Sequence, residues 1–412
     1  MAQDTEPRGY PVGRRTLLKG AALAAAPPAL AAAPARAQSP ATGLVPPLPV
    51  PTGPHPVGVT ALHLVDHSRP DPWEAIPVRE VMVTVHYPAR AVDGRPLARV
   101  FSPGAARVFG EIDAYVHHLP ASGVDWAAVT GHAHLGAPAL GHRRPVLLHS
   151  PGGLDPRTIG TSFAEELASH GYVVVTVDHP GDAGEVEFPY PTAYRGTVRT
   201  TVFRGDPRAD PALFRTAIDT RLADLRFVLG RLRALAAGAD PDAERRPLPE
   251  GLGHTIDPAR IGVYGHSAGG TVAAETLHHN RDVRAAVNLE GYLDQPGSAP
   301  GRPGPLYPVA EHGVDRPLLL VATEGFGHRA ELERSWSALL ARSPRHVTRR
   351  RLDHTAHWIF TDYAAYAPWL RAAGVMAPAD RAALVGTADP AVSVPLVRGV
   401  LRAFFARHLP VC

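Results

Sequence analysis

The sequence predicts an α/β fold with a mostly parallel central sheet, helices on both faces and an antiparallel start. Short apolar runs recur along the chain, and stretches with helical spacing of apolar residues separate them. Such runs are typical of strands buried on both faces, and their alternation with helices favours a parallel sheet. Two runs near the front instead alternate apolar and polar residues, as half-buried strands do. These two runs predict the antiparallel start.

The predicted elements follow one another in a regular order. The opening strands are residues 58–66 and 80–90, and the buried strands are 144–150, 172–181, 260–265, 284–291, 317–325 and 346–354. Helices are predicted at 158–171, 210–238, 269–279, 328–342 and 393–409. In the longest helix, Asp210 can cap the N-terminus and Pro211 suits the first turn. Its apolar stripe consists of Ile218, Leu222, Leu225, Leu229 and Leu232.

Residues 91–143 match no sheet element and are expected to form an insertion in the main domain, which spans residues 59–412. The insertion contains one predicted helix, in the stretch "AARVFGEIDAYVHHL". It precedes the strand that ends in Pro151-Gly152-Gly153, so we expect it to lie over the mouth of a site at the end of that strand.

The N-terminal residues 1–37 are typical of a twin-arginine export signal. Arg14 and Arg15 precede an Ala-rich apolar stretch, and Ala35-Arg36-Ala37 offers a cleavage site, which predicts an exported protein cut near Ala37. The apolar stretch 20–33 is too short for a membrane anchor, which needs about 20 residues. Residues 38–58 are rich in proline and are expected to form an extended linker or a wrapping arm.

Charge and composition exclude several classes of function. The chain has 42 basic and 39 acidic residues, and the export signal holds five of the basic and two of the acidic ones, so the remainder carries 37 of each. A net charge of zero gives no indication of nucleic-acid binding. Lys19 is the only lysine and lies in the signal, which excludes a mechanism that needs a Schiff-base or general-base lysine.

The stretch "GVYGHSAGG" predicts a nucleophile at Ser267. A serine in G-x-S-x-G between a strand and a helix sits on a strained turn that exposes its hydroxyl. Serine also needs a base, an acid that orients the base, and two donors for the oxyanion. One donor is the N–H of Ala268, and the other should come from the loop 151–154, where two glycines let the backbone turn its N–H groups toward a substrate.

The sequence leaves the acid and the base open. Glu290 and Glu324 each end a predicted strand between the nucleophile and the last strand, and Asp294 is a weaker third choice. The segment "LDHTAHWIF" offers His354 and His357 as the base. Position alone does not choose between the two glutamates.

The chain resembles α/β-hydrolases of the platelet-activating factor acetylhydrolase type and their bacterial lipase and esterase relatives. The resemblance covers roughly residues 55–412 and is carried by "PVLLHSPGG", "ASHGYVVVTVDHPGD", "DPARIGVYGHSAGG", "RAAVNLEGYL" and "AHWIFTDY". It implies an α/β-hydrolase fold in which Glu290 is the acid, His357 is the base and Gly153 is the second oxyanion donor. Phe360 and Asp362 match the family's H-x-x-F-x-D-like segment. The sequence departs from the family at Glu290, which is usually Asp, and at Ala268, which is often Phe.

Together these observations predict an exported serine hydrolase that cleaves carboxylic esters through an acyl-enzyme. We expect a small-molecule or lipid ester as substrate and no metal, nucleotide or organic cofactor. An acyltransferase or amidase could use the same residues, and a non-catalytic binding protein is the alternative from another class.

Other residues give weaker signals. His132, His134 and His142 give only a weak zinc pattern, because no acid or cysteine completes it. Asp178 and His179 are interpreted as structural support, and Phe188, Tyr190 and Tyr194 either line an acyl pocket or pin a loop.

Overall fold

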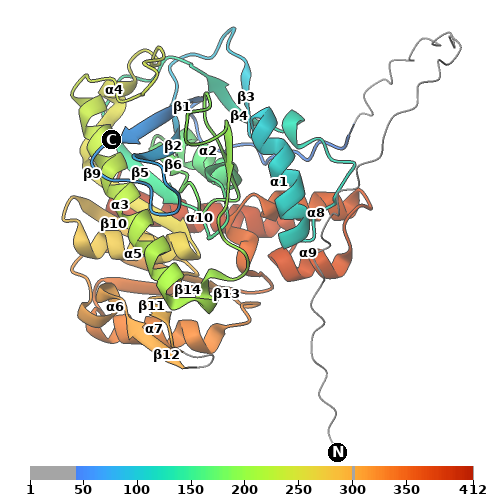
Figure 1. Cartoon of the computed structure of the whole chain (residues 1–412), viewed down its shortest axis with the longest axis vertical. Helices are drawn as coiled ribbons and strands as arrows, with labels where there is room; N and C mark the ends of the chain where they lie inside the picture. The colour runs from blue at the N-terminus through green and yellow to red at the C-terminus, as the bar shows by residue number, and fades with distance from the viewer. Residues whose placement is uncertain (1–42, 299–301, 412) are drawn as a thin grey trace, which may run out of the picture. The chain divides into compact units, whose positions relative to one another are not determined.

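The computed structural model describes residues 43–298 and 302–411, and its centre is a ten-stranded sheet (Figure 1). The strands lie in the order β14-β13-β10-β9-β5-β6-β2-β1-β4-β3. Their bounds are β1 Val57–Asp66, β2 Arg79–Pro88, β3 Leu97–Arg99, β4 Thr130–Leu135, β5 Arg144–Ser150, β6 Val173–Val177, β9 Ile256–His266, β10 Val283–Leu289, β13 Leu318–Thr323 and β14 Val347–Leu352. Two small antiparallel pairs lie outside the sheet: β7 Glu185–Glu187 with β8 Val198–Thr200, and β11 Asp294–Pro296 with β12 Pro303–Leu306. The predicted export signal and its cleavage site fall outside the described residues.

The sheet is parallel from β14 to β6 and antiparallel where β6 meets β2 and β2 meets β1. The predicted mostly parallel sheet with an antiparallel start is therefore confirmed. Strand β5 lies between β6 and β9, so the loops after β5 and β9 leave the sheet at the same edge. This adjacency brings the predicted oxyanion loop next to the predicted nucleophile turn.

Helices cover both faces of the sheet, as predicted. One apolar core packs α2, α8 and α10 against one face, and a second core packs α3, α5, α6 and α7 against the other. The α-helices are α1 Pro103–Val116, α2 Thr161–Ser169, α3 Pro211–Ala236, α4 Leu252–Thr255, α5 Ala268–His279, α6 Pro308–His312, α7 Arg329–Arg342, α8 Tyr363–Ala372, α9 Pro378–Val385 and α10 Pro390–His408. Four 3₁₀ turns complete them: η1 Trp126–Ala128, η2 Arg157–Gly160, η3 Pro207–Ala209 and η4 His357–Phe360. Asp210 caps α3 as predicted, because its carboxylate accepts the N–H groups of Ala212 and Leu213.

The prediction that residues 91–143 contribute no strand is wrong. Strand β4 pairs in parallel with β1, and β3 pairs with β4, so the segment forms one edge of the sheet. Both strands are short and only partly buried, which is why they carry no apolar alternation. Their pairing satisfies backbone groups of β1 and moves the edge of the sheet to the short strand β3. The predicted helix of this segment is present as α1, and Figure 1 draws it beside α8, where the rings of Phe109 and Tyr363 stack.

The described part of the proline-rich segment is a wrapping arm. The N–H and hydroxyl of Thr52 donate to Glu166 on α2 at 2.8 Å and 2.6 Å. Arg398 on α10 donates to the carbonyl oxygens of Pro49 and Val50. Side chains of the main domain thus satisfy backbone groups that an extended, proline-rich segment cannot pair internally.

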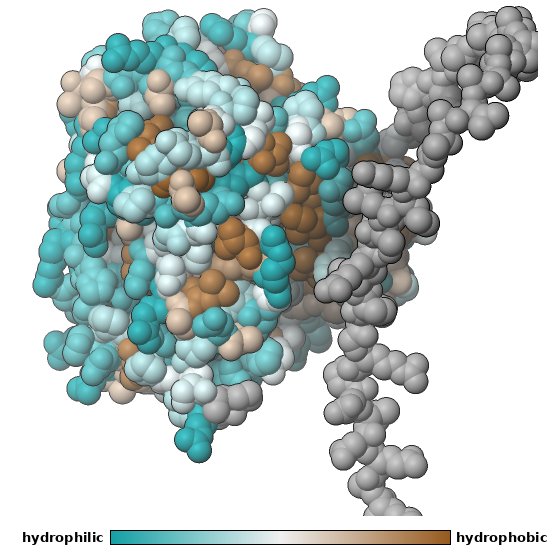
Figure 2. All heavy atoms as spheres, viewed as in Figure 1, coloured by the Kyte–Doolittle hydropathy of each residue, from teal (hydrophilic) through white to brown (hydrophobic). Residues whose placement is uncertain are grey.

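Much of the face in Figure 2 is hydrophilic, and hydrophobic residues gather toward its middle and right. Of the exposed large hydrophobic side chains, Tyr115 on α1 is 86% exposed.

Among residues 43–298 and 302–411, no helix has both the length and the apolar character to cross a membrane.

Candidate active site

Ser267 sits on a strained turn between β9 and α5. Its backbone has φ 53° and ψ −120°, a conformation that non-glycine residues rarely adopt. A Cβ at Gly265 would lie 2.1 Å from the carbonyl oxygen of Gly269, and a Cβ at Gly269 would lie 1.9 Å from that of Ser150. The two flanking glycines are therefore required by space, and the turn is the strand–turn–helix element that the sequence predicted.

A cavity of about 1730 Å³ opens at this turn. Ser267, Ala268, Gly153 and His357 all line it, so the structure brings these predicted site residues together. Helix α1, the loop from β8 to α3, and the segments around Gln295 and Phe326 form the walls. The inserted helix, which we expected over the mouth of the site, contributes the following residues to this lining: Arg107, Val108, Glu111, Ile112, Tyr115 and Val116.

Glu290 lies behind His357, on the end of β10. Its Oε2 is 2.8 Å from the Nδ1 of His357. The carboxylate is fully buried and also accepts the backbone N–H and, at 2.8 Å, the hydroxyl of Thr323. The carboxylate thus has three donors: the N–H and the hydroxyl of Thr323, and the Nδ1 of His357. The bond to His357 holds the imidazole with Nδ1 toward Glu290 and Nε2 on the opposite side of the ring.

The structure places the other candidates elsewhere. Glu324 accepts the backbone N–H of His354 at 2.7 Å, and both side chains are well exposed, at 47% and 76%. This pair stabilises the loop after β14 and does not contact His357. Asp294 pairs with Arg334 and lies 3.8 Å from Arg208. Geometry thus pairs the imidazole with Glu290, a choice that position in the sequence left open.

Sequence reasoning missed the groups that surround the imidazole of His357. The ring of Phe326 stacks on it at 5.0 Å between centroids, and that of Trp358 meets it edge-on at 4.9 Å. His266 packs against it at 4.4 Å, and burial holds the pKa of His266 well below its usual value, so this neighbour is neutral. Its place in the G-x-S-x-G motif could have indicated His266, whereas nothing local in the sequence indicates Phe326.

A buried serine–histidine–aspartate series lies beneath the loop 151–154. The Oγ of Ser150 is 2.9 Å from the Nε2 of His179, whose Nδ1 is 2.9 Å from Asp224. All three are fully buried and none lines the cavity, so this series cannot reach a substrate. Desolvation lowers the pKa of His179 to about 4, so the ring is neutral and bridges the other two groups. The interpretation of His179 as structural support agrees with these contacts.

The remaining aromatic and histidine candidates do not form part of the site. None of Phe188, Tyr190 and Tyr194 lines the cavity. Phe188 is buried under the guanidinium of Arg195, which holds its loop, and the two tyrosines are exposed. His132 bonds to the carbonyl of Leu48, and His134 to that of Arg95. Across the described residues, no three metal-ligating side chains are arranged to hold an ion.

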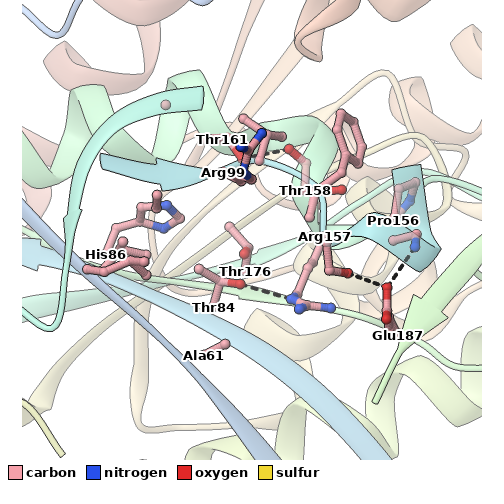
Figure 3. A pocket seen from close by; sticks show the side chains of 18 of the residues that line it. Ala61, Thr84, His86, Arg99, Pro156, Arg157, Thr158, Thr161, Thr176 and Glu187 are labelled. Carbon is pink, nitrogen blue, oxygen red and sulfur yellow. Dashed lines mark hydrogen bonds between the residues drawn. The ribbon is translucent and has the colours of Figure 1, made fainter. Parts of the chain in front are cut away.

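A second cavity, of about 420 Å³, shares no lining residue with the first (Figure 3). It lies against β1, β2 and β6 and contains none of the predicted site residues. Arg157 reaches into it, and its Nε donates to the hydroxyl of Thr84 at 2.9 Å, as Figure 3 shows. The same residue bonds to Asp178 through both its backbone N–H and its guanidinium. Arg157 therefore anchors the chain just after the loop 151–154, and Asp178 has the supporting role expected for it.

Asp362 anchors the segment that carries His357. Its carboxylate accepts the N–H of Ser162 at 3.1 Å, and its own N–H donates to the carbonyl of Ile159 at 2.7 Å. These bonds tie the end of η4 to the start of α2. Complete burial raises the pKa of Asp362 to about 7.

Comparisons with known proteins show the family and the fold of this chain. The model of the family described as platelet-activating factor acetylhydrolase, isoform II, matches residues 48–370. A protein of Arthroderma benhamiae named a probable 1-alkyl-2-acetylglycerophosphocholine esterase is 26% identical over 382 residues, which are 87% of each chain. The solved structure of a ferulic acid esterase from Streptomyces cinnamoneus is 31% identical, with a TM-score of 0.63 over 89% of this chain and 94% of that one. The predicted α/β-hydrolase fold is thereby confirmed.

Replacing Asp362 by Asn should change how stability depends on pH. A carboxyl whose pKa is raised in the folded state stabilises the fold at low pH, and that contribution is lost as the pH rises through the folded value near 7. Between pH 5 and pH 8 the free energy of unfolding of the wild type should therefore fall by about 2 kcal/mol relative to that of Asp362→Asn. Urea unfolding at both pH values measures this difference, with exposed Asp353→Asn as the control. If the free energy of unfolding of the wild type instead rises from pH 5 to pH 8 relative to that of Asp362→Asn, the raised pKa of Asp362 is contradicted.

Proposed function

The chain belongs to the platelet-activating factor acetylhydrolase, isoform II, family and is a serine ester hydrolase, and we propose that Ser267, His357 and Glu290 form its catalytic triad. The observation that carries the proposal is the 2.8 Å contact between His357 and the buried Glu290, at a cavity that both His357 and Ser267 line. Glu324, which follows β13, instead accepts the N–H of His354, a residue that does not line this cavity.

In the proposed reaction, His357 removes the proton from the Ser267 hydroxyl as Ser267 attacks the ester carbonyl. Glu290 keeps the Nδ1 proton of His357 in place and stabilises the imidazolium that forms. His357 then gives its proton to the leaving alcohol. Water attacks the acyl-enzyme with the same histidine as base, which releases the acid and restores Ser267.

The N–H groups of Ala268 and Gly153 are proposed to bind the oxyanion. Ala268 is the first residue of α5, where N–H groups have no partner within the helix and the helix dipole favours negative charge. Gly153 is its neighbour at the cavity, since a Cβ at Gly153 would lie 3.9 Å from that of Ala268. Backbone N–H groups from two adjacent segments are the usual donors to an oxyanion.

The substrate is proposed to be a small-molecule or lipid carboxylic ester. The fungal relative is named for a glycerophosphocholine ester, which contains a phosphate. A volume of about 1730 Å³ accommodates a lipid ester as well as a small one.

We also propose that the protein is exported by the twin-arginine route and cleaved after Ala37. The support is in the sequence: Arg14-Arg15, the apolar stretch 20–33 and the small residues at 35 and 37.

Ser267→Ala should abolish turnover while the protein stays folded. Because members of a triad act as a unit, kcat should fall by about 10³–10⁶, and His357→Ala should behave alike. His354→Ala is the matched control and should keep activity within about threefold, since its side chain is exposed and does not reach the cavity lining. Hydrolysis of p-nitrophenyl esters of rising chain length measures all three. Activity of Ser267→Ala within tenfold of wild type refutes the nucleophile.

Glu290→Gln and Glu324→Gln should differ sharply. The first keeps the shape of the side chain but removes the charge that orients His357, so kcat should fall by about three to four orders of magnitude. The second should cost tenfold at most. Glu290→Asp should retain part of the activity, because the family usually has Asp there. If Glu324→Gln is the inactive variant, the acid is on the next strand.

Export can be tested by replacing Arg14 and Arg15 by Lys. The double variant should accumulate in the cytoplasm at full length, while the wild type should be secreted with Gln38 at or near its N-terminus. Cell fractionation and mass spectrometry of the N-terminal peptide measure the two outcomes. A secreted wild-type protein that still begins near Met1 refutes cleavage at this site.

A further inference from the structure

A buried arginine lies directly behind the loop that carries Gly153. Arg221, on α3, is fully buried, and its guanidinium donates to the carbonyl oxygens of Pro151 at 2.6 Å and Gly152 at 2.8 Å. Asp182 accepts from its Nε at 2.6 Å and from its Nη2 at 2.8 Å. The bidentate pair gives the planar guanidinium one orientation, and its other N–H groups bind the loop.

The bond to Gly152 determines where the Gly153 N–H points. In a planar trans peptide unit the C=O and the N–H point in opposite directions, and all peptide bonds in the described residues are trans. The carbonyl of Gly152 points into the protein toward Arg221. The N–H of Gly153 belongs to the same unit and therefore points away from Arg221, on the side where Gly153 lines the cavity.

The neighbouring N–H groups of the loop are already used. Leu154 donates its N–H to Asp182 at 3.2 Å, and Asp155 donates its N–H to the carbonyl of Gly152 at 3.3 Å. No hydrogen bond among the described residues uses the N–H of Gly153. Asp182 thus both orients Arg221 and takes the adjacent N–H, which leaves Gly153 as the donor for a substrate oxygen.

Both ends of the loop are fixed by other contacts. Before it, the Ser150 hydroxyl bonds to His179. After it, Arg157 bonds to Asp178 and, as Figure 3 shows, to Thr84. Between these anchors, glycine at positions 152 and 153 would let the peptide units rotate, because glycine adopts positive and negative φ about equally well. The bonds from Arg221 to the carbonyl oxygens of Pro151 and Gly152 hold these units in place.

We propose that Arg221 is a positioning residue that keeps the Gly153 N–H directed at the oxyanion. The inference rests on the proposed function, which assigns that N–H to the oxyanion hole. Without Arg221 the peptide between Gly152 and Gly153 can flip. A flip replaces the N–H by a carbonyl oxygen, which repels the negative charge that develops on the substrate.

Arg221→Met should lower kcat by about 10²–10³, the effect of losing one oxyanion donor, with KM within about threefold of wild type. Affinity for a trifluoromethyl ketone analogue, which forms an oxyanion on Ser267, should fall by a similar factor. Affinity for an ether analogue of the substrate, which has no carbonyl group and forms no oxyanion, should not change. Arg221→Lys keeps the charge and one bond to the loop, so its kcat should lie between those of Arg221→Met and wild type, and it provides the test if Arg221→Met does not fold.

Arg195→Met is the matched control. Arg195 is also buried and pairs with Glu80 through two bonds, at 2.7 Å and 2.5 Å, but it does not contact the loop. The variant Arg195→Met should lower the Tm as Arg221→Met does and leave kcat per folded molecule unchanged. If Arg221→Met and Arg221→Lys keep wild-type kcat and ketone affinity while Ser267→Ala is inactive, the role of Arg221 is refuted and the proposed function stands. If Ser267→Ala is itself active, the proposed function fails.

Discussion

The arrangement of the site depends on how closely the turn at Ser267 approaches the end of strand β5. A Cβ at Gly269 would lie 1.9 Å from the Ser150 carbonyl oxygen, so no other residue fits there without moving the backbone. Strands β5 and β9 are parallel neighbours, and their loops leave the sheet together. Because glycines permit this contact, the start of α5 and the loop 151–154 face the same cavity.

Charged groups form the rigid support behind this contact. Arg79, Arg221, Asp224 and Asp182 are all buried, and each is paired. Buried ion pairs are costly to desolvate and contribute little net stability. Their effect here is geometric: guanidinium groups bind carboxylates and backbone carbonyls in fixed directions, so the polypeptide around the site has one conformation.

The side of the site that holds His357 is built differently. Phe326, Trp358 and the neutral His266 surround its ring, and Glu290 lies behind it. The side chain of His357 is 14% exposed and that of Glu290 is fully buried, and a contact between an imidazolium and a carboxylate is stronger where water is excluded. The rigid polar support thus lies behind the oxyanion loop, and the less polar surroundings lie around the base.

The sequence by itself determined eight strands of the sheet, the turn at Ser267 and the short set of acids and histidines near it. These features depend on local patterns: apolar runs, glycines at fixed spacing and residues at strand ends. The family resemblance selected Glu290 and His357 from that set. Only the tertiary structure showed that Glu290 contacts His357 while Glu324 bonds to His354, since that depends on side-chain direction. The sequence also did not indicate strands β3 and β4, Phe326 or Arg221, because each owes its place to a partner far away in the chain, and long-range pairing leaves no local pattern.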